Sequence, residues 1–268
     1  MNRRGGAAVS KHPQATQFMA GHSKWANIQH RKGAQDKKRA KVFSKCSKVI
    51  MSAVKQAGPD PEMNLTLRYA IDKARQVNMP RDNIERAIKA AQGSEGGDKY
   101  EEVMYEGYGP SGVAFMVAAL TDNRNRTAPE LRKIFEKSGG KLGTSGSVAH
   151  QFERKAFFSV SKDDADEDRM MDVALECGAD DVNEEGDLWE ITGTPDVFSD
   201  IRDALIKAKL EAKTSEVAML PMIQVEVTDE AVAGRIVKLM EALDDHDDVD
   251  QIFSNVDIPD AIMEKVVG

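Results

Sequence analysis

The stretch that decides the fold lies between "KAFFSVS" (155–161) and "TSEVAML" (214–220), which both have the composition of β-strands. Two helical patterns and two further strand patterns separate them. In chain order these are a helix at 166–178, strands at 179–185 and 187–192, and a helix at 194–209. The order strand–helix–strand–strand–helix–strand is that of the ferredoxin-like fold. The sequence therefore predicts a ferredoxin-like α+β domain over 153–220.

The segments on either side of this domain each have only part of a domain. Before it lie two strand patterns in "YEEVMYEGYGPSGVAFMVAALT" (100–121) and a helix from Thr127, where Thr127 and Glu130 have capping-box spacing. After it lie strand, helix and strand patterns, at 222–227, 229–243 and 249–257. We therefore predict that the ferredoxin-like domain is inserted in a second α+β domain, made of 97–152 and 221–257. Residues 258–268 are expected to be a C-terminal tail.

The residues before these domains have the pattern of a basic, all-helical head, predicted at 19–96. Apolar residues recur at spacings of three and four over 36–57, and the turn sequence "GPDP" then ends the helix. A second helix follows Asn64, which is expected to cap it, and a third lies within 80–93. We expect a three-helix bundle, preceded at 1–18 by a disordered extension that lacks the apolar run of a secretory signal.

The charge of the chain is divided unevenly between head and body. The 268 residues include 37 Lys and Arg against 45 Asp and Glu, so the net charge is −8. Residues 1–93 nevertheless have 19 basic and 6 acidic residues, a net +13, whereas the remainder has 18 and 39, a net −21. A basic head on an acidic body indicates that the head binds a polyanion.

The candidate nucleic-acid contacts are the basic residues of the head and one tryptophan among them. They are Lys24, Trp25, His30, Arg31, Lys32, Lys37, Lys38, Arg39, Lys41, Lys45 and Lys48. The last lysines recur at helical spacing, opposite the apolar side, and such groups contact phosphates without reading sequence. The alternative is a solvated lysine face, but such faces usually mix signs, and Asp36 is the one acid between Gly21 and Lys55. A membrane surface is disfavoured because the helix lacks a broad Leu/Trp face.

Three other stretches have residues typical of ligand sites. Arg124 and Arg126 precede the helix predicted from Thr127 and are secondary anion-binding candidates, with an ordinary loop as an equal alternative. "GGKLGTSGS" (139–147) follows a helix and does not have the P-loop order, so we expect a flexible loop and no nucleotide hydrolase. "DDHDDVD" (244–250) lacks the central glycine and closing glutamate of an EF-hand, which favours a solvated helix end over an incidental metal site.

The sequence has no pattern typical of a catalytic or cofactor site. Cys46 and Cys177 are far apart and each is expected in a core, and the five histidines are scattered. None of the common nucleophile or zinc-protease motifs is present. No apolar run reaches the roughly 18 residues of a membrane span. We therefore expect a reduced, cytoplasmic protein that is not an enzyme and has no cofactor, metal or small-molecule substrate.

Motifs along nearly the whole chain resemble one family. "MAGHSKWANIQHRKGAQDKKRAKVFSK" (19–45) resembles the opening of the YebC/PmpR family, which includes the mitochondrial translational activator of cytochrome c oxidase subunit I. Further similar stretches are "NMPRDNIERAIKAA" (78–91), "YEGYGPSGVAFMVAALTDNRNRTAPELR" (105–132), "GTSGSVAHQF" (143–152) and "DDHDDVDQIFSN" (244–255). The resemblance implies an all-α head and two α+β domains, one ferredoxin-like and inserted in the other, in a non-enzymatic bacterial cytoplasmic factor.

The resemblance also implies two partners for the head motif "HSKWANIQHRKGAQDKKRAK" (22–41). The family has the label of probable transcriptional regulator that binds DNA, and its members are also associated with the ribosome, where they assist translation through consecutive prolines. Three function classes therefore remain: a DNA-binding regulator, a factor that binds ribosomal RNA or the ribosome, and an enzyme. Lysines outnumber the residue types that read base edges, and the body is acidic, which favours folded RNA slightly.

Overall fold

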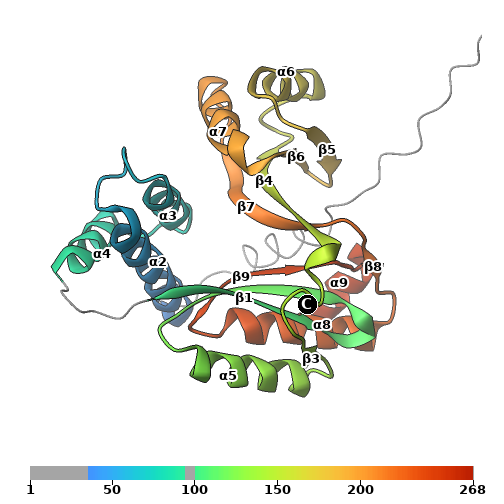
Figure 1. The fold of residues 1–268 in the computed structure, drawn as a ribbon. Helices are drawn as coiled ribbons and strands as arrows, with labels where there is room; N and C mark the ends of the chain where they lie inside the picture. Colours follow the sequence, from blue (N-terminus) through green and yellow to red (C-terminus); the bar gives the residue numbers. More distant parts are fainter. Residues whose placement is uncertain (1–35, 94–99, 268) are drawn as a thin grey trace, which may run out of the picture.

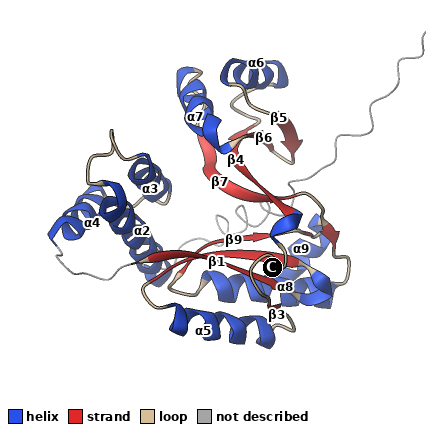
Figure 2. Ribbon diagram, in the orientation of Figure 1, coloured by secondary structure: helices blue, strands red, loops and turns tan. Residues whose placement is uncertain are grey.

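The chain folds into a helical head and two α+β domains, as Figures 1 and 2 show. The structure is a computed structural model that describes residues 36–93 and 100–267. The predicted fold class, with one α+β domain inserted in the other, is confirmed by the order of the elements and of the strands. The extension predicted at 1–18 lies outside the described residues.

In its described residues the head has three amphipathic helices, as predicted. They are α2 (Asp36–Ala57), α3 (Leu65–Gln76) and α4 (Arg81–Gly93). Their apolar sides meet in one core, in which Ile50 and Leu67 are fully buried. Asn64 caps α3: its side-chain oxygen accepts from the Leu67 N–H at 3.0 Å, and its amide donates to the carbonyl of Ala53 at 2.8 Å. One side chain therefore joins the end of α2 to the start of α3.

The host domain is assembled from two separate parts of the chain. The first contributes β1 (Glu101–Tyr108), β2 (Ala114–Thr121), α5 (Arg124–Lys137) and β3 (Lys141–Leu142). The second contributes β8 (Val225–Glu226), α8 (Glu230–Asp244), β9 (Val249–Ser254), β10 (Val256–Asp257) and α9 (Asp260–Val267). The main sheet has the order β3-β1-β2-β9, and β8 pairs with β10. Phe115 of β2 and Phe135 of α5 meet edge to face in the core between sheet and helices.

Two boundaries of the host domain differ from the sequence predictions. Helix α5 begins before Thr127, because the Asn123 side chain accepts from the Arg126 N–H at 3.2 Å and caps the helix there. The helix start predicted at Thr127 is therefore wrong. Residues 258–268, predicted as a tail, contain α9, whose Ile262 and Val266 lie one turn apart and pack against the host core.

The inserted domain has the ferredoxin-like topology. Its elements are β4 (Phe152–Ser161), α6 (Glu167–Cys177), β5 (Asp181–Glu185), β6 (Leu188–Gly193), α7 (Phe198–Lys207) and β7 (Ala212–Pro221). The strand order is β5-β6-β4-β7, so the first and last strands are neighbours. The Met222 N–H donates to the Gln151 carbonyl at 2.8 Å just outside this pair. The chain thus enters and leaves the insert at one place, and the host sheet is not interrupted.

The three parts pack against one another. The host sheet places Met116 and Phe253 in a core with Phe157 and Leu220 of the insert. In the head, the ring of Tyr69 lies 4.5 Å from that of Phe198 in α7. The head therefore contacts the insert through α3, and its position relative to both α+β domains is defined. Within the described residues, no helix is long and apolar enough to cross a membrane.

Candidate nucleic-acid interface

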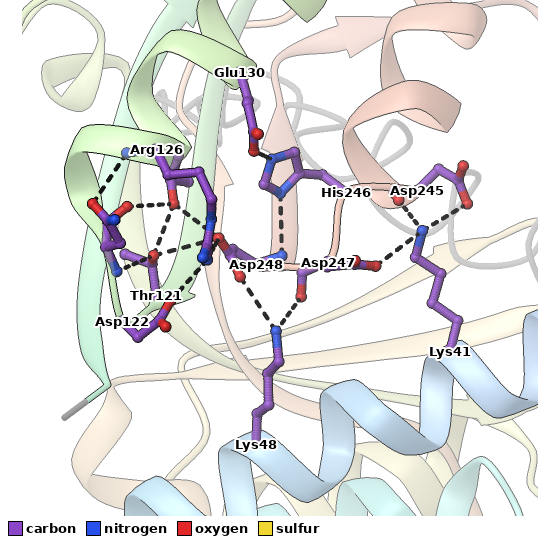
Figure 3. Close-up of polar contacts among 12 residues, drawn as sticks. Lys41, Lys48, Thr121, Asp122, Arg126, Glu130, Asp245, His246, Asp247 and Asp248 are labelled. Atoms are coloured by element: carbon purple, nitrogen blue, oxygen red, sulfur yellow. Dashed lines mark hydrogen bonds and ion pairs between the residues drawn. The ribbon is translucent and has the colours of Figure 1, made fainter. Parts of the chain in front are cut away.

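The lysine side of α2 faces an acidic turn of the host domain (Figure 3). We define the acidic turn as Asp244, Asp245, His246, Asp247 and Asp248, which connect α8 to β9. We define the lysine face as Lys41, Lys45 and Lys48, which lie on successive turns of α2. Each lysine of this face contacts the acidic turn, so the two surfaces are complementary in charge along their length.

Lys41 and Lys45 contact the first part of the turn and Asp247. The ammonium group of Lys41 lies 3.3 Å from a carboxylate oxygen of Asp245 and 3.2 Å from one of Asp247. Lys45 lies 3.8 Å from a carboxylate oxygen of Asp244 and donates to the carbonyl of the same residue. The cations therefore meet both the carboxylates and the last carbonyls of α8, the negative end of that helix.

Lys48 makes the innermost contact between the two surfaces. Its ammonium group lies 3.2 Å from a carboxylate oxygen of Asp248 and donates to the Asp247 carbonyl at 3.1 Å. The side chain of Asp248 is only 3% exposed, whereas those of Asp245 and Asp247 are 77% and 75% exposed. The cavity between α2 and the turn is about 10 Å³, which is at the lower limit for one water molecule. The ammonium and carboxylate groups are therefore in direct contact.

The electrostatics of the interface follow from this burial. Burial opposes the charge of Lys41, but hydrogen bonds to Asp247 and Asp245 outweigh it and raise its pKa. For Lys45 burial is the larger effect, and its pKa is lowered despite the attraction of Asp244. The hydrogen bond from Lys41 lowers the pKa of Asp247.

Asp248 is the centre of a wider network that reaches α5. One of its oxygens accepts from the Arg126 guanidinium at 2.7 Å and from the Thr127 hydroxyl at 2.9 Å. Burial alone would raise the pKa of Asp248, but these bonds and that from Lys48 lower it to about 2. A buried carboxylate held in this way is ionised and costly to remove.

His246 fixes the conformation of the turn. The Asp248 N–H donates to its Nδ1 at 3.1 Å, so Nδ1 has no proton, and Nε2 donates to a carboxylate oxygen of Glu130 at 2.9 Å. The imidazole thereby connects the turn to α5. Lys73 of α3 adds a further ion pair near the turn, with Asp250 at 2.9 Å.

The predicted head contacts have different outcomes. Lys24, Trp25, His30, Arg31 and Lys32 lie outside the described residues. Lys37, Lys38 and Arg39 lie in the first turns of α2, where Arg39 is exposed. Lys41, Lys45 and Lys48 lie together on one side of α2, as the spacing predicts, but they contact carboxylates of the same chain.

The other predicted sites require corrections. The run 244–250, predicted as a solvated helix end, contacts the head, and Asp248 is buried within it. Arg124 and Arg126 lie inside the first turn of α5, and both form ion pairs with carboxylates of the same chain. Arg124 pairs with Glu101 at 2.6 Å, and Arg126 pairs with Asp122 and Asp248.

The loop 139–147 is not a free surface loop either, because the carboxylate of Glu106 in β1 binds backbone N–H groups at its end. The carboxylate of Glu106 accepts from the N–H groups of Gly146, Val148 and Ala149 at 2.6 to 2.9 Å. Burial opposes its charge, but these three bonds lower its pKa. The expectation of a flexible loop is therefore wrong at its end, where backbone N–H groups hold a carboxylate of the protein.

The described residues contain no group of three or more His, Cys, Asp or Glu side chains that could hold a metal ion. Cys46 and Cys177 are free and buried, as predicted. Sequence reasoning missed that the acidic turn is the partner of the lysine face. The sequence shows an acidic run and a lysine run about two hundred residues apart, but their opposite charge alone does not pair them.

Comparisons with known proteins agree over most of the chain. Residues 23–94 match the family model "TACO1/YebC protein N-terminal domain", and residues 100–256 match "TACO1/YebC second and third domain". A protein of Halothermothrix orenii named "Probable transcriptional regulatory protein" is 50% identical, over 92% of this chain and 99% of its own length. One of Rhodopirellula baltica with the same kind of name is 53% identical, over 90% and 98%.

A solved structure has the same fold. The crystal structure of a conserved hypothetical protein, Aq1575, from Aquifex aeolicus superposes with a TM-score of 0.76. It is 42% identical in sequence and covers 84% of this chain and 92% of its own.

Proposed function

The chain belongs to the TACO1/YebC family, and from that premise we propose that it is a non-enzymatic regulator of gene expression that binds nucleic acid through its head. The names of its relatives, as probable transcriptional regulatory proteins, support regulation. The observation that carries the proposal is the lysine face, whose three ammonium groups are spaced along one side of α2 to meet a row of anions. Nucleic acid presents such a row as its phosphates.

DNA is the first candidate partner, because the names of the relatives refer to transcription. A second candidate, ribosomal RNA or the ribosome, is favoured by the surroundings of α2. The acidic turn lies along the lysine face, so a long, straight duplex on α2 would also approach the exposed carboxylates of Asp245 and Asp247. A folded RNA can present a short run of phosphates without that approach. Lysine also contacts phosphates as a point charge, and arginine, asparagine and glutamine are the usual readers of base edges.

The test is sedimentation of the full chain with ribosomes, at about 0.1 M and about 0.5 M salt and with excess duplex DNA as competitor. Co-sedimentation that survives the DNA and weakens with salt would support the RNA partner. Binding of a promoter fragment without co-sedimentation would support the DNA partner. Binding to neither would contradict the proposal.

A matched pair of variants assigns the binding to the head. Lys37→Gln, Lys38→Gln and Arg39→Gln together remove three predicted contacts and leave the lysine face in place. Arg132→Gln, Lys133→Gln and Lys137→Gln remove the same charge from exposed positions on α5. We expect the first triple variant to weaken binding by about tenfold or more and the second to have little effect, since each lost phosphate contact reduces the affinity. Equal weakening would assign the binding to net charge alone.

A further inference from the structure

We propose that the lysine face is a site for a short run of phosphates and that the acidic turn occupies this site as an internal competitor. Nucleic acid would then bind the lysine face only after the acidic turn has left it. This inference rests on the proposed function and specifies how the same site is regulated. It follows from the geometry of the contact, from the charge of the turn and from the strength of the ion pairs.

The geometry makes the two partners mutually exclusive. Side-chain exposure is 32% for Lys41, 15% for Lys45 and 24% for Lys48, and each ammonium group is already directed at the turn. From Lys41 to Lys48 the face extends about 10 Å along the helix, since each residue adds about 1.5 Å. About three phosphates of one strand occupy that length of a duplex axis. The turn therefore fills the place of a short phosphate run.

The acidic turn has a concentrated negative charge that nearby cations stabilise. Asp244 and Asp245 lie at the C-terminal end of α8, where the helix dipole already concentrates negative charge and favours basic residues. The last turn of α8 contains no basic residue. The lysine face supplies the missing cations from another part of the chain. A turn of this composition would otherwise repel itself.

The contacts are weak enough to exchange. Lys41 and Lys45 pair with carboxylates that are at least half exposed, and such ion pairs are individually weak and screened by salt. Asp248, which forms the buried ion pair with Lys48, also accepts hydrogen bonds from Arg126 and Thr127. These two bonds remain when the lysine leaves. Loss of the lysine face therefore does not leave this carboxylate without partners.

The test compares two variants of equal net charge in the full chain. Asp244→Asn, Asp245→Asn and Asp247→Asn remove the exposed charges of the acidic turn and leave Asp248 in place. Asp163→Asn, Asp168→Asn and Asp172→Asn remove three exposed charges from the inserted domain. The probes are a labelled RNA hairpin and a duplex DNA of about 30 nucleotides per strand, and the dissociation constants are measured at about 0.1 M salt.

We expect the turn variant to bind the preferred probe about tenfold tighter than the matched control, because the fraction of head available for binding increases. If the triple variant does not fold, Asp245→Asn with Asp247→Asn, both at highly exposed positions, serves in its place, and Asp163→Asn with Asp168→Asn is then the control of equal net charge. Equal affinities of turn variant and control, with the unmodified chain binding normally, would overturn this inference and leave the proposed function intact. Failure of all three proteins to bind either probe would instead contradict the proposed function.

Hydrogen–deuterium exchange gives a readout that is independent of affinity. Addition of the preferred probe to the unmodified chain should increase exchange at the N–H groups of the acidic turn, because the lysines no longer hold the turn by its carbonyls. Unchanged protection of the turn at saturating probe would overturn the inference.

Discussion

At the scale of single residues, the protein fills its anion-binding positions with its own carboxylates. Asp248 occupies the position beside Arg126 at the start of α5, and Glu106 accepts from the N–H groups of Gly146, Val148 and Ala149. The sequence indicated the first position, because arginine near a helix start is typical of anion sites, whereas the glycine-rich loop was expected to be flexible. The sequence did not indicate which anion fills these positions, since the two carboxylates come from distant strands and turns.

Asp248→Asn should destabilise the protein by about 2–4 kcal/mol, because it removes the charge that compensates the guanidinium of Arg126 and the ammonium of Lys48. Thermal or urea unfolding measures this change. Asp245→Asn is the control within the same turn, and its side chain is 77% exposed, so a change of no more than about 0.5 kcal/mol is expected. Equal effects of the two substitutions would show that Asp248 is not the centre of the network.

The stabilisation from Asp248 should depend on pH. Its pKa is lowered from 3.8 to about 2 in the folded protein, so its stabilising effect is complete well above pH 3.8 and is lost as the pH falls towards 2. The loss amounts to about 2 kcal/mol by linkage. The free energy of unfolding of the unmodified chain and of Asp248→Asn should therefore converge between about pH 5 and pH 2. A constant difference over this interval would contradict the assigned cause.

At the scale of elements, local sequence predicts most of the structure, because helices and strands depend on neighbouring residues. The periodic apolar residues of α2 and the cap at Asn64 were both predicted correctly. The start of α5 was not, because Asn123 and Thr127 both suit a cap and the choice depends on tertiary contacts. Thr127 bonds the buried Asp248, and so it is used inside the helix.

Asn64→Ala should destabilise the head by about 2–3 kcal/mol, because it removes the cap of α3 and leaves the carbonyls of Ala53 and Gly58 without this donor. Asn64→Ser retains a cap oxygen and removes the amide donors without introducing a buried charge, so its effect should be smaller. Hydrogen exchange of α2–α4 resolves the head from the other domains. An alanine variant as stable as the serine variant would show that the cap contributes nothing.

At the scale of the whole molecule, the sequence predicts the parts better than their contacts. The insertion could be inferred because one complete strand and helix series lies between two incomplete ones. The contact of α2 with the acidic turn could not, because charge patterns give the sign of a partner and not its identity. A basic helix opposite an acidic run in the same chain satisfies the same electrostatic rule as a basic helix on nucleic acid.

The insertion leads to a prediction about folding. Residues 152–222, expressed alone, should fold cooperatively, because the ferredoxin-like core is completed within this range. The first strand of the range, β4, also pairs with its last strand, β7. Circular dichroism during urea unfolding should show a single transition. A fragment that ends at Leu210 is the control: it lacks β7 and leaves β4 as an unpaired edge, so no cooperative transition is expected. If residues 152–222 also fail to fold, then the contacts of Phe157 and Leu220 with the host sheet are required, and the insert depends on its host.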